Sequence, residues 1–237
     1  MPSVWRRAAR NILTAATPET VGAQPAFYQD LQACFGFAWK KLEAAPKRRT
    51  EPFRTPTLAT VDANGQPQQR VMVLRDVDRG ANRLPRLRFH SDVRAPKCAQ
   101  LSTRPACSVL FYDKVEKVQV RANGLSEVCI LADGAGSASA LHAWRASSPA
   151  SRRCYFVDDA PSDMTTLDRL NALEVSLLST DAANPDNISP HFACVMVHVS
   201  ELEFLYLAHT GSRRAVVRYS VDSQTEVLLQ DCMWLVP

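Results

Sequence analysis

The sequence of 237 residues lacks the features that mark several common classes of protein. Its seven cysteines are odd in number, widely spread and nowhere spaced as C-x-x-C, which favours a reduced, cytoplasmic setting and indicates no metal site. No apolar run approaches the ~18 residues that suggest a membrane span, and no apolar stretch follows the basic N-terminal residues as it would in a secretory signal. We therefore expect a cytoplasmic protein without a membrane partner.

A strong net charge and the common nucleotide-binding loops are missing as well. The formal charge of +4 is too small to indicate nucleic-acid binding, which needs a basic face with base-reading or stacking elements, but it suits a small anionic ligand. Neither G-x-G-x-x-G nor G-x-x-x-x-G-K-[ST] occurs. If the protein binds a nucleotide, its side chains must hold it, and no nucleic-acid partner is expected.

The composition that is present, 46% hydrophobic and 22% charged, is that of an ordinary globular protein. Residues 1–22 carry Arg6, Arg7 and Arg10 ahead of the first acid and are predicted to form a basic, poorly ordered N-terminal arm, with a weak transit peptide as the alternative. Residues 23–237 are predicted to form a single domain with a helical insertion at about 134–180.

Hydrophobic periodicity predicts a chain dominated by short strands. About nine strands without regular strand and helix alternation argue against a doubly wound parallel sheet. The predicted fold is mainly β with helices (α+β), an antiparallel sheet that closes as a barrel. Helices are predicted at 26–45, 96–104, 137–146 and 162–178, and strands at 55–61, 68–77, 86–92, 106–113, 117–128, 191–199, 201–208, 215–221 and 226–235.

The clearest hairpin turns at Asn64-Gly65, because these residues supply the positive backbone angles of a tight turn. Its second strand, 68–77, places Arg70 and Arg75 at the two ends of an apolar run. Since five positions separate the arginines, a regular strand would point them to opposite faces. Both reach one ligand only if the strand bulges or a second subunit brings the other face into the site.

One constellation suits an anion. The segment FHSDVRAPK ends a strand at His90 and Ser91 and then places Arg94 and Lys97 around the start of a helix. The free N–H groups and partial positive charge of a helix N-terminus add to the two cations, which together suit a phosphate. Ordinary solvated basic residues near a helix end are the alternative.

A second polar element is the strand VQVRANG, in which Gln119 and Arg121 share a face because side chains repeat every two residues. Polar side chains on a barrel strand need partners, and a ligand with amide-like edges is one candidate. The alternative is that both side chains face water. No histidine carries a partner pattern that indicates a general base, so the catalytic residues stay unknown.

Several of these motifs together resemble the pyridoxamine 5′-phosphate oxidase-like FMN-binding split barrels. The matching runs are FRTPTLATVD, RVMVLR, FHSDVRAPK, LFY and QVRANG, in this order and spacing over 53–124, with HFACVMVHVSELEFLYL and the closing WLVP after them. The helical middle matches only loosely. The resemblance implies a split β-barrel, an FMN cofactor, and a homodimer with two flavins at the subunit interface.

The resemblance also implies the residues of the flavin site. The RVMVLR strand lies along the flavin, the basic residues after the next strand lie near its phosphate, a strand glutamine meets the ring system, and an arginine near the C-terminus reaches the flavin of the second subunit. These residues are Arg70, Val71, Met72, Val73, Arg75, His90, Ser91, Arg94, Lys97, Gln119 and Arg214.

The chain departs from the family at its substrate site. The oxidase holds its vitamin B6 substrate partly through an Arg-x-His pair, but neither Arg213 nor Arg214 is followed two places on by histidine, and the family's tryptophan is replaced by Leu205 or Leu207. Arg152 is a candidate contact for a substrate anion, with an ordinary surface arginine as the alternative. We therefore expect an FMN-dependent oxidoreductase related to the oxidase, acting on an unknown, anionic small molecule. The alternative is a flavin- or haem-binding protein on the same barrel.

Overall fold

The computed structural model describes residues 24–131, 134–209 and 211–237. The N-terminal arm predicted at 1–22 lies outside the described residues. Within them, no helix is long and apolar enough to cross a membrane.

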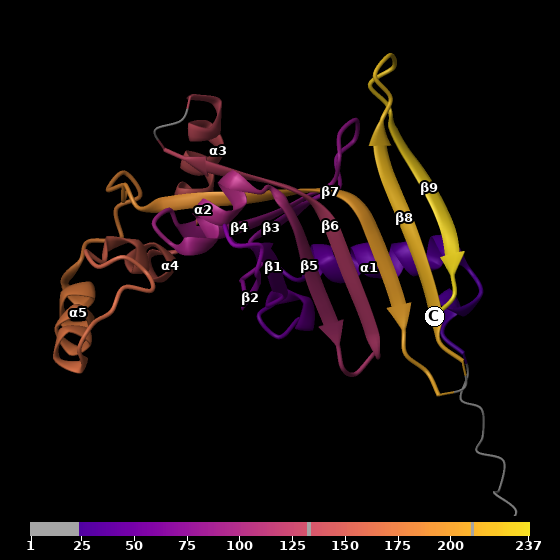
Figure 1. Cartoon of the computed structure of the whole chain (residues 1–237), viewed down its shortest axis with the longest axis horizontal. Coiled ribbons are helices and arrows are strands. Elements are labelled where there is room, and N and C mark those ends of the chain that lie inside the picture. Colours follow the sequence, from indigo (N-terminus) through magenta and orange to yellow (C-terminus); the bar gives the residue numbers. More distant parts are fainter. Residues whose placement is uncertain (1–23, 132–133, 210) are drawn as a thin grey trace, which may run out of the picture.

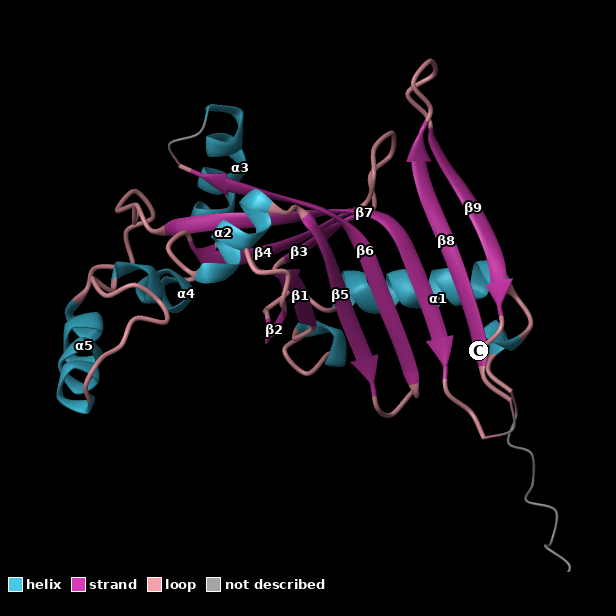
Figure 2. Cartoon of the chain, viewed as in Figure 1, coloured by secondary structure: helices cyan, strands magenta, loops and turns pink. Residues whose placement is uncertain are grey.

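In the described residues nine strands form a single antiparallel sheet, shown with the helices in Figures 1 and 2. The hydrogen-bonded order is β2-β1-β5-β6-β7-β4-β3, with β8 on β7 and β9 on β8. No ladder joins the ends of this order to each other in the described chain, so the sheet curves without closing. The strands are β1 (Thr57–Val61), β2 (Pro67–Val71), β3 (Asp76–Asp78), β4 (Arg86–Asp92), β5 (Ala106–Asp113), β6 (Val118–Ile130), β7 (Phe192–Tyr206), β8 (Arg213–Val221) and β9 (Leu228–Leu235).

The strand β7 divides the sheet into two halves. Its first half, 192–198, pairs with β4, and its second half, 201–206, pairs with β8, while β6 pairs with both halves. The prediction of two separate strands at 191–199 and 201–208 is therefore wrong. The polar pair Ser200-Glu201 suggested a break, but the chain stays extended there because β6 continues to pair with it.

The register between β6 and β7 shifts by one residue at Asn123 and Gly124. A Cβ at Gly124 would lie only 1.9 Å from the backbone oxygen of His198, so the two strands touch here more closely than any side chain allows. The bulge bends the pair where β7 passes from β4 to β8. Gly124 thus lies at the point where the two halves of the sheet diverge.

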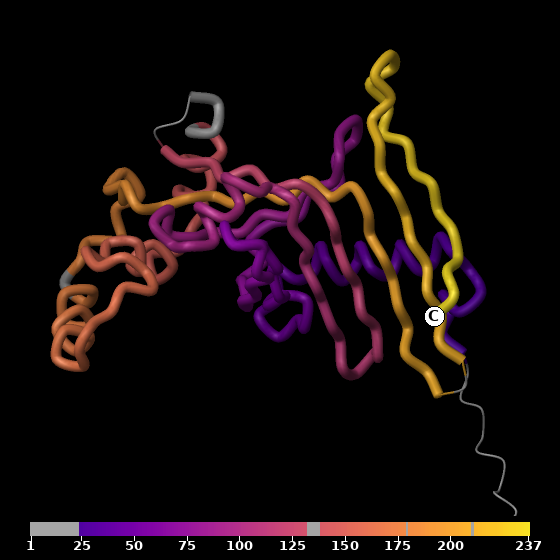
Figure 3. The backbone as a smooth tube through the Cα atoms, in the orientation of Figure 1, coloured from indigo at the N-terminus to yellow at the C-terminus, as the bar shows by residue number. Residues whose placement is uncertain are grey.

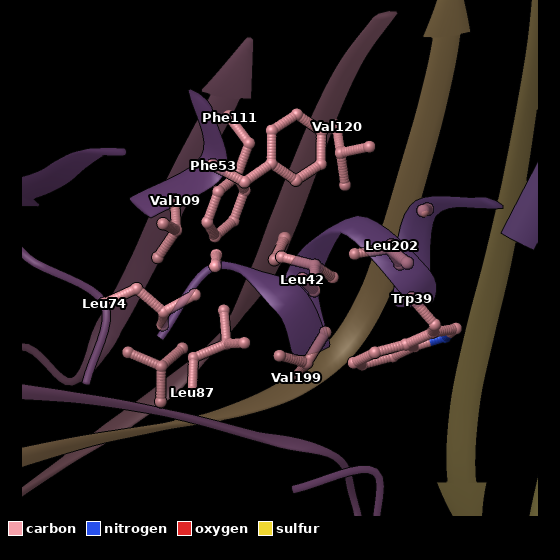
Figure 4. Packing of buried hydrophobic residues seen from close by; sticks show 14 of the residues in the cluster. Trp39, Leu42, Phe53, Leu74, Leu87, Val109, Phe111, Val120, Val199 and Leu202 are labelled. Carbon is pink, nitrogen blue, oxygen red and sulfur yellow. The ribbon is translucent and has the colours of Figure 1, made fainter. Parts of the chain in front are cut away.

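One helix fills the concave side of the sheet. α1 (Leu31–Ala44) begins at Asp30, whose side chain accepts hydrogen bonds from two backbone N–H groups of the first turn. Its apolar face packs on residues from both halves of the sheet. Figure 4 shows Trp39 and Leu42 with Leu202 of β7 and with Phe53, which lies just before β1. The N-terminal end of this helix lies near the last two strands, β8 and β9 (Figure 3), so both ends of the domain share one core.

The strand predicted at 68–77 is interrupted. β2 ends at Val71 and β3 begins at Asp76, because the chain stops pairing with β1 and starts pairing with β4. Between them the backbone stays hydrogen-bonded in single contacts, such as Met72 N to Pro56 O at 2.9 Å and Arg75 N to Arg88 O at 2.8 Å.

The remaining helices lie on the periphery. α2 (Pro96–Thr103) follows β4, and α3 (Gly134–Arg145), α4 (Pro149–Arg153) and α5 (Leu167–Ser179) lie between β6 and β7, in the stretch where a helical insertion was predicted. The sequence predictions missed the short α4. A second apolar cluster around Trp144 and Phe192 attaches α3 to the sheet.

Candidate cofactor site

A cavity of about 470 Å³ lies between the end of β4, the start of α2 and the loop that leads into α5. Three consecutive residues at the end of β4, His90, Ser91 and Asp92, line it. Since alternate residues of a strand point to opposite faces, they surround the strand end rather than share one face. Four residues of the predicted flavin site line this cavity together: Met72, His90, Ser91 and Lys97.

Lys97 supplies the cation of this cavity. It occupies the first turn of α2, where Pro96 starts the helix and the backbone N–H groups lack helical partners. Burial is the largest effect on the pKa of Lys97 and lowers it. Arg70 lowers the pKa as well, whereas Cys98 and Asp92 act in the opposite direction. Within the described chain its ammonium group makes no hydrogen bond or ion pair, so its charge remains available to an anion.

Arg70 lies near Lys97, and its guanidinium is held by neutral groups. Its guanidinium donates to Thr60 Oγ1 at 2.6 Å and to Gln100 Oε1 at 3.2 Å, and burial lowers its pKa. With no carboxylate among these partners, the positive charge of Arg70 adds to the potential at Lys97.

Unlike Arg70, Arg94 has a carboxylate among its hydrogen-bond partners. Its Nε and Nη2 donate to the carboxylate of Asp92, at 3.0 and 2.7 Å. Nη2 also donates to Val157 O and Nη1 to Asp158 O, each at 2.8 Å. These bonds attach the wall of the cavity to the end of β4. Contact between Arg94 and a phosphate stays a prediction. In the structure the side chain links Asp92 to the backbone at Val157 and Asp158.

Arg75 lies elsewhere, in a second cavity of about 560 Å³ that also includes His90. The interruption after β2 explains why the two arginines of the apolar run separate: Arg70 stays under α2 with β1, whereas Arg75 follows the chain toward β4. Sequence reasoning missed Arg88, which lines this second cavity and lies two positions before His90 on the same face of β4. That two-residue spacing could have indicated it.

Gln119 and Arg214 lie on the outer face of the sheet, away from both cavities. Both residues pair with Leu205 of β7, Gln119 from β6 on one side and Arg214 from β8 on the other. On the same face the buried carboxylate of Glu203 accepts from Arg121 at 2.6 Å and from Arg214 at 2.9 Å. Val71 is exposed on this face too, whereas Val73 lies in the interruption. One chain alone therefore does not bring all the predicted residues together.

His90 is a neutral side chain between two arginines. Burial, and then the cations of Arg75 and Arg88, lower its pKa to about 3. Its ring meets Phe192 edge-on, with centroids 5.0 Å apart, which keeps the imidazole in an apolar contact as well. The imidazole therefore carries no charge at neutral pH.

This shift predicts a pH-dependent stability. Between pH 6.5 and 3 the unfolded chain binds a proton at His90 and the folded chain does not, so stability should fall as the pH falls, by up to about 1.4 kcal/mol per pH unit. The check is urea unfolding at pH 7, 6 and 5 of the protein and of a His90→Phe variant. The variant should lose less stability between pH 7 and 5, and parallel curves would contradict the assignment.

Comparison with known proteins gives consistent results. Residues 37–130 match the family described as the FMN-binding domain of pyridoxamine 5′-phosphate oxidase. The chain is similar to pyridoxine/pyridoxamine 5′-phosphate oxidases, with 31% identity over 140 residues to that of Maricaulis maris strain MCS10 (56% of this chain, 59% of the relative) and 33% over 87 residues to that of Caulobacter vibrioides strain NA1000 / CB15N (36% of each). The matched segments thus span from about a third to three fifths of these relatives.

Two solved structures share the fold over most of the chain. One is a pyridoxamine 5′-phosphate oxidase-related, FMN-binding protein from Nostoc punctiforme PCC 73102, with a TM-score of 0.69 and 19% identity, covering 91% of this chain and 100% of that one. The other is PhzG from Burkholderia lata 383 in complex with tetrahydrophenazine-1-carboxylic acid, with a TM-score of 0.66 and 19% identity, covering 92% and 100%. These folds confirm the predicted α+β split-barrel class, and residues 37–130 match the FMN-binding domain family that the sequence motifs resemble.

Proposed function

We propose that this chain is an FMN-binding flavoprotein that works as an FMN-dependent oxidoreductase. The observation that carries the proposal is the unpaired ammonium group of Lys97, half-buried at the first turn of α2 in a cavity of about 470 Å³, within the segment that matches the FMN-binding domain family. A dianionic phosphate at this place would meet one free cation, the field of Arg70 and free backbone N–H groups.

The residues present fit FMN. Lys97 and Arg70 would hold the phosphate, and Met72 would supply an apolar contact on the cavity wall. When bound, the flavin accepts hydride and passes the electrons on, which is chemistry that the protein itself does not supply. The protein's part is to place the cofactor and to set the charge around it.

Residues on the outer face of the sheet support a homodimer with FMN at the interface. Gln119 and Arg214 lie there, away from the cavity of their own chain, so they would reach a flavin only across an interface. Exposed apolar side chains on this sheet, which suit burial against a second copy, are Val71, Leu110, Tyr112 and Leu125. We propose a cytoplasmic homodimer whose substrate is a small anionic molecule.

The purified protein is expected to be yellow and to release FMN on denaturation. Oxygen-dependent formation of pyridoxal phosphate from pyridoxamine phosphate should be weak, because Arg213 and Arg214 lack the histidine two places on. A colourless protein that takes up no added FMN would contradict the proposal. A yellow protein with full pyridoxamine phosphate oxidase activity would contradict the expectation of a different substrate, and haem uptake in place of FMN would support the alternative.

A further inference from the structure

The outer wall of the candidate cofactor cavity, of about 470 Å³, is a single loop of residues 157–166, named the lid. Between Val157 and Thr165 every residue except Asp158 and Met164 lines the cavity. From Pro161 onward each residue of the lid is also exposed to solvent. The lid is therefore a single layer of chain between the cavity and the solvent.

Packing against the core holds the chain on either side of the lid but not the lid itself. The chain is buried at Tyr155 before the lid and again at Ala182 after α5. From Pro161 to Leu178 no side chain of the described chain is buried, and α5 exposes 72% of Leu167 and 70% of Val175. Figure 1 shows α5 standing apart from the sheet. A segment with so few buried contacts opens at a low cost in free energy.

Arg94, in the turn between β4 and α2, connects the start of the lid to the body of the protein. Its bonds to Val157 O and Asp158 O, each of 2.8 Å, reach the first two residues of the lid. Asp92 holds the same guanidinium from the other side through Nε and Nη2. Because the donors of an arginine lie in one rigid plane, the carboxylate fixes the direction in which the other donors point. Arg94 is thus preorganised to hold the two carbonyl groups of the lid.

The other polar contacts of the lid are internal to the lid and α5. Asp159 pairs with Arg169 of α5 at 2.9 Å, and the backbone N–H of Asp163 donates to Ala160 O at 3.2 Å. Neither contact reaches the sheet, so both would move with the lid when it opens. Among the described residues, Arg94 is therefore the only hydrogen-bonding link between the lid and the body of the protein.

We propose that residues 157–166 are a lid that opens to admit and to release the ligand of this cavity, and that Arg94 is its latch. Four of the five N–H groups of Arg94 are already in use, whereas Lys97 is free to hold the anion of the ligand. Arg94 is then a positioning residue that controls the rates of binding rather than the affinity. The inference deepens the proposed function and rests on it for FMN as the ligand, though not for the opening of the lid.

Stopped-flow flavin fluorescence with the FMN-free full chain tests the latch. The slope and the intercept of the observed rate against protein concentration give the association and dissociation rate constants. Arg94→Met is expected to raise both by about tenfold, the value of one charged hydrogen bond, and to change Kd by less than about threefold. Both rates rise together because a latch present in the free and the bound protein sets the open fraction of each. Loss of a direct phosphate contact would instead raise the dissociation rate alone and weaken Kd.

Two further variants separate the latch from other effects of the arginine. Arg104 also donates to two backbone oxygens of a loop, Asp62 O at 2.7 Å and Ala63 O at 3.2 Å, but lies outside the cavity, so Arg104→Met should change neither rate. Arg94→Lys keeps the positive charge but lacks the fork that spans two carbonyl groups, so it should raise both rates as Arg94→Met does. Near-ultraviolet circular dichroism shows whether each variant has folded, and Arg94→Lys serves if Arg94→Met has not.

Limited proteolysis tests the lid without FMN. Thermolysin, which cleaves before large apolar residues, should cut before Met164 about tenfold faster in Arg94→Met than in the unmodified chain or in Arg104→Met, because the open population sets the rate of cleavage. Equal cleavage would overturn the latch, and so would unchanged FMN rates or a weaker Kd with unchanged association. Faster cleavage in a protein that takes up no FMN would keep the lid and remove the proposed function, whereas FMN uptake with equal cleavage would do the reverse.

Discussion

Replacement of Lys97 by alanine is expected to weaken FMN binding by about 1.5–3 kcal/mol, which corresponds to roughly 10- to 150-fold in Kd. Lys97 offers the one side-chain cation among the described residues lining the 470 Å³ cavity. Its ammonium group has already lost part of its hydration, as the lowered pKa indicates, and Asp92 acts on its charge without a hydrogen bond or ion pair to it. A phosphate would restore a full set of partners to it, so the loss on removal should be large.

The measurement is quenching of flavin fluorescence when apo-protein is titrated into FMN. Lys114→Ala removes the same charge from an exposed position and is the matched control. Lys97→Arg should recover part of the affinity, because it keeps the charge but changes its geometry. Comparison of FMN with riboflavin separates the phosphate from the ring, since Lys97→Ala should leave riboflavin binding unchanged. Equal FMN affinity in Lys97→Ala and Lys114→Ala would count against the assignment.

The sequence predicted much of this site because its residues lie in one continuous stretch. The segment from β4 to α2 has strong local signals, an alternating strand followed by Pro96 at the helix start, and both elements form where they were expected. Lys97 is therefore placed by local rules alone. The same reasoning holds for the strand at 106–113, whose period-2 pattern coincides with β5.

What the sequence did not predict depends on contacts between distant segments. Arg70 and Arg75 were expected on opposite faces of one strand, but they separate because the chain changes its pairing partner from β1 to β4 between them. No local sequence pattern indicates where a strand changes its pairing partner. The charge of the second cavity likewise comes from Arg54 before β1, Arg75 after β2 and Arg88 in β4, which only the folded sheet brings together.

The continuity of β7 was missed for a related reason. Ser200 and Glu201 interrupt the apolar pattern, so two strands were expected, yet the chain is one strand of 15 residues. The interruption marks the place where β7 changes neighbours, at the bulge opposite Asn123 and Gly124. When the partner strand is not known, polar residues at a bulge predict a turn in place of a continuous strand.

Replacement of Gly124 by alanine is expected to lower the free energy of unfolding by about 3–5 kcal/mol, at the high end for a single substitution. The added Cβ would lie 1.9 Å from His198 O, 2.8 Å from His198 C and 3.1 Å from Val199 Cα. All three are backbone atoms of β7, so no flexible side chain can move aside to make room. β6 and β7 would have to separate at the one position where both halves of the barrel depend on their pairing.

Urea unfolding followed by far-ultraviolet circular dichroism measures this effect, at equal protein concentrations because subunit association adds to stability. Gly36→Ala is the matched control: this glycine lies exposed within α1, with nothing within 4 Å of the new Cβ, so the change should stabilise by about 0.5–1 kcal/mol. The same methyl group thus has opposite expected effects at the two positions. A Gly124→Ala protein within about 1 kcal/mol of the unmodified chain would show that the strands can part without loss, and the bulge would then not be what fixes the split of the barrel.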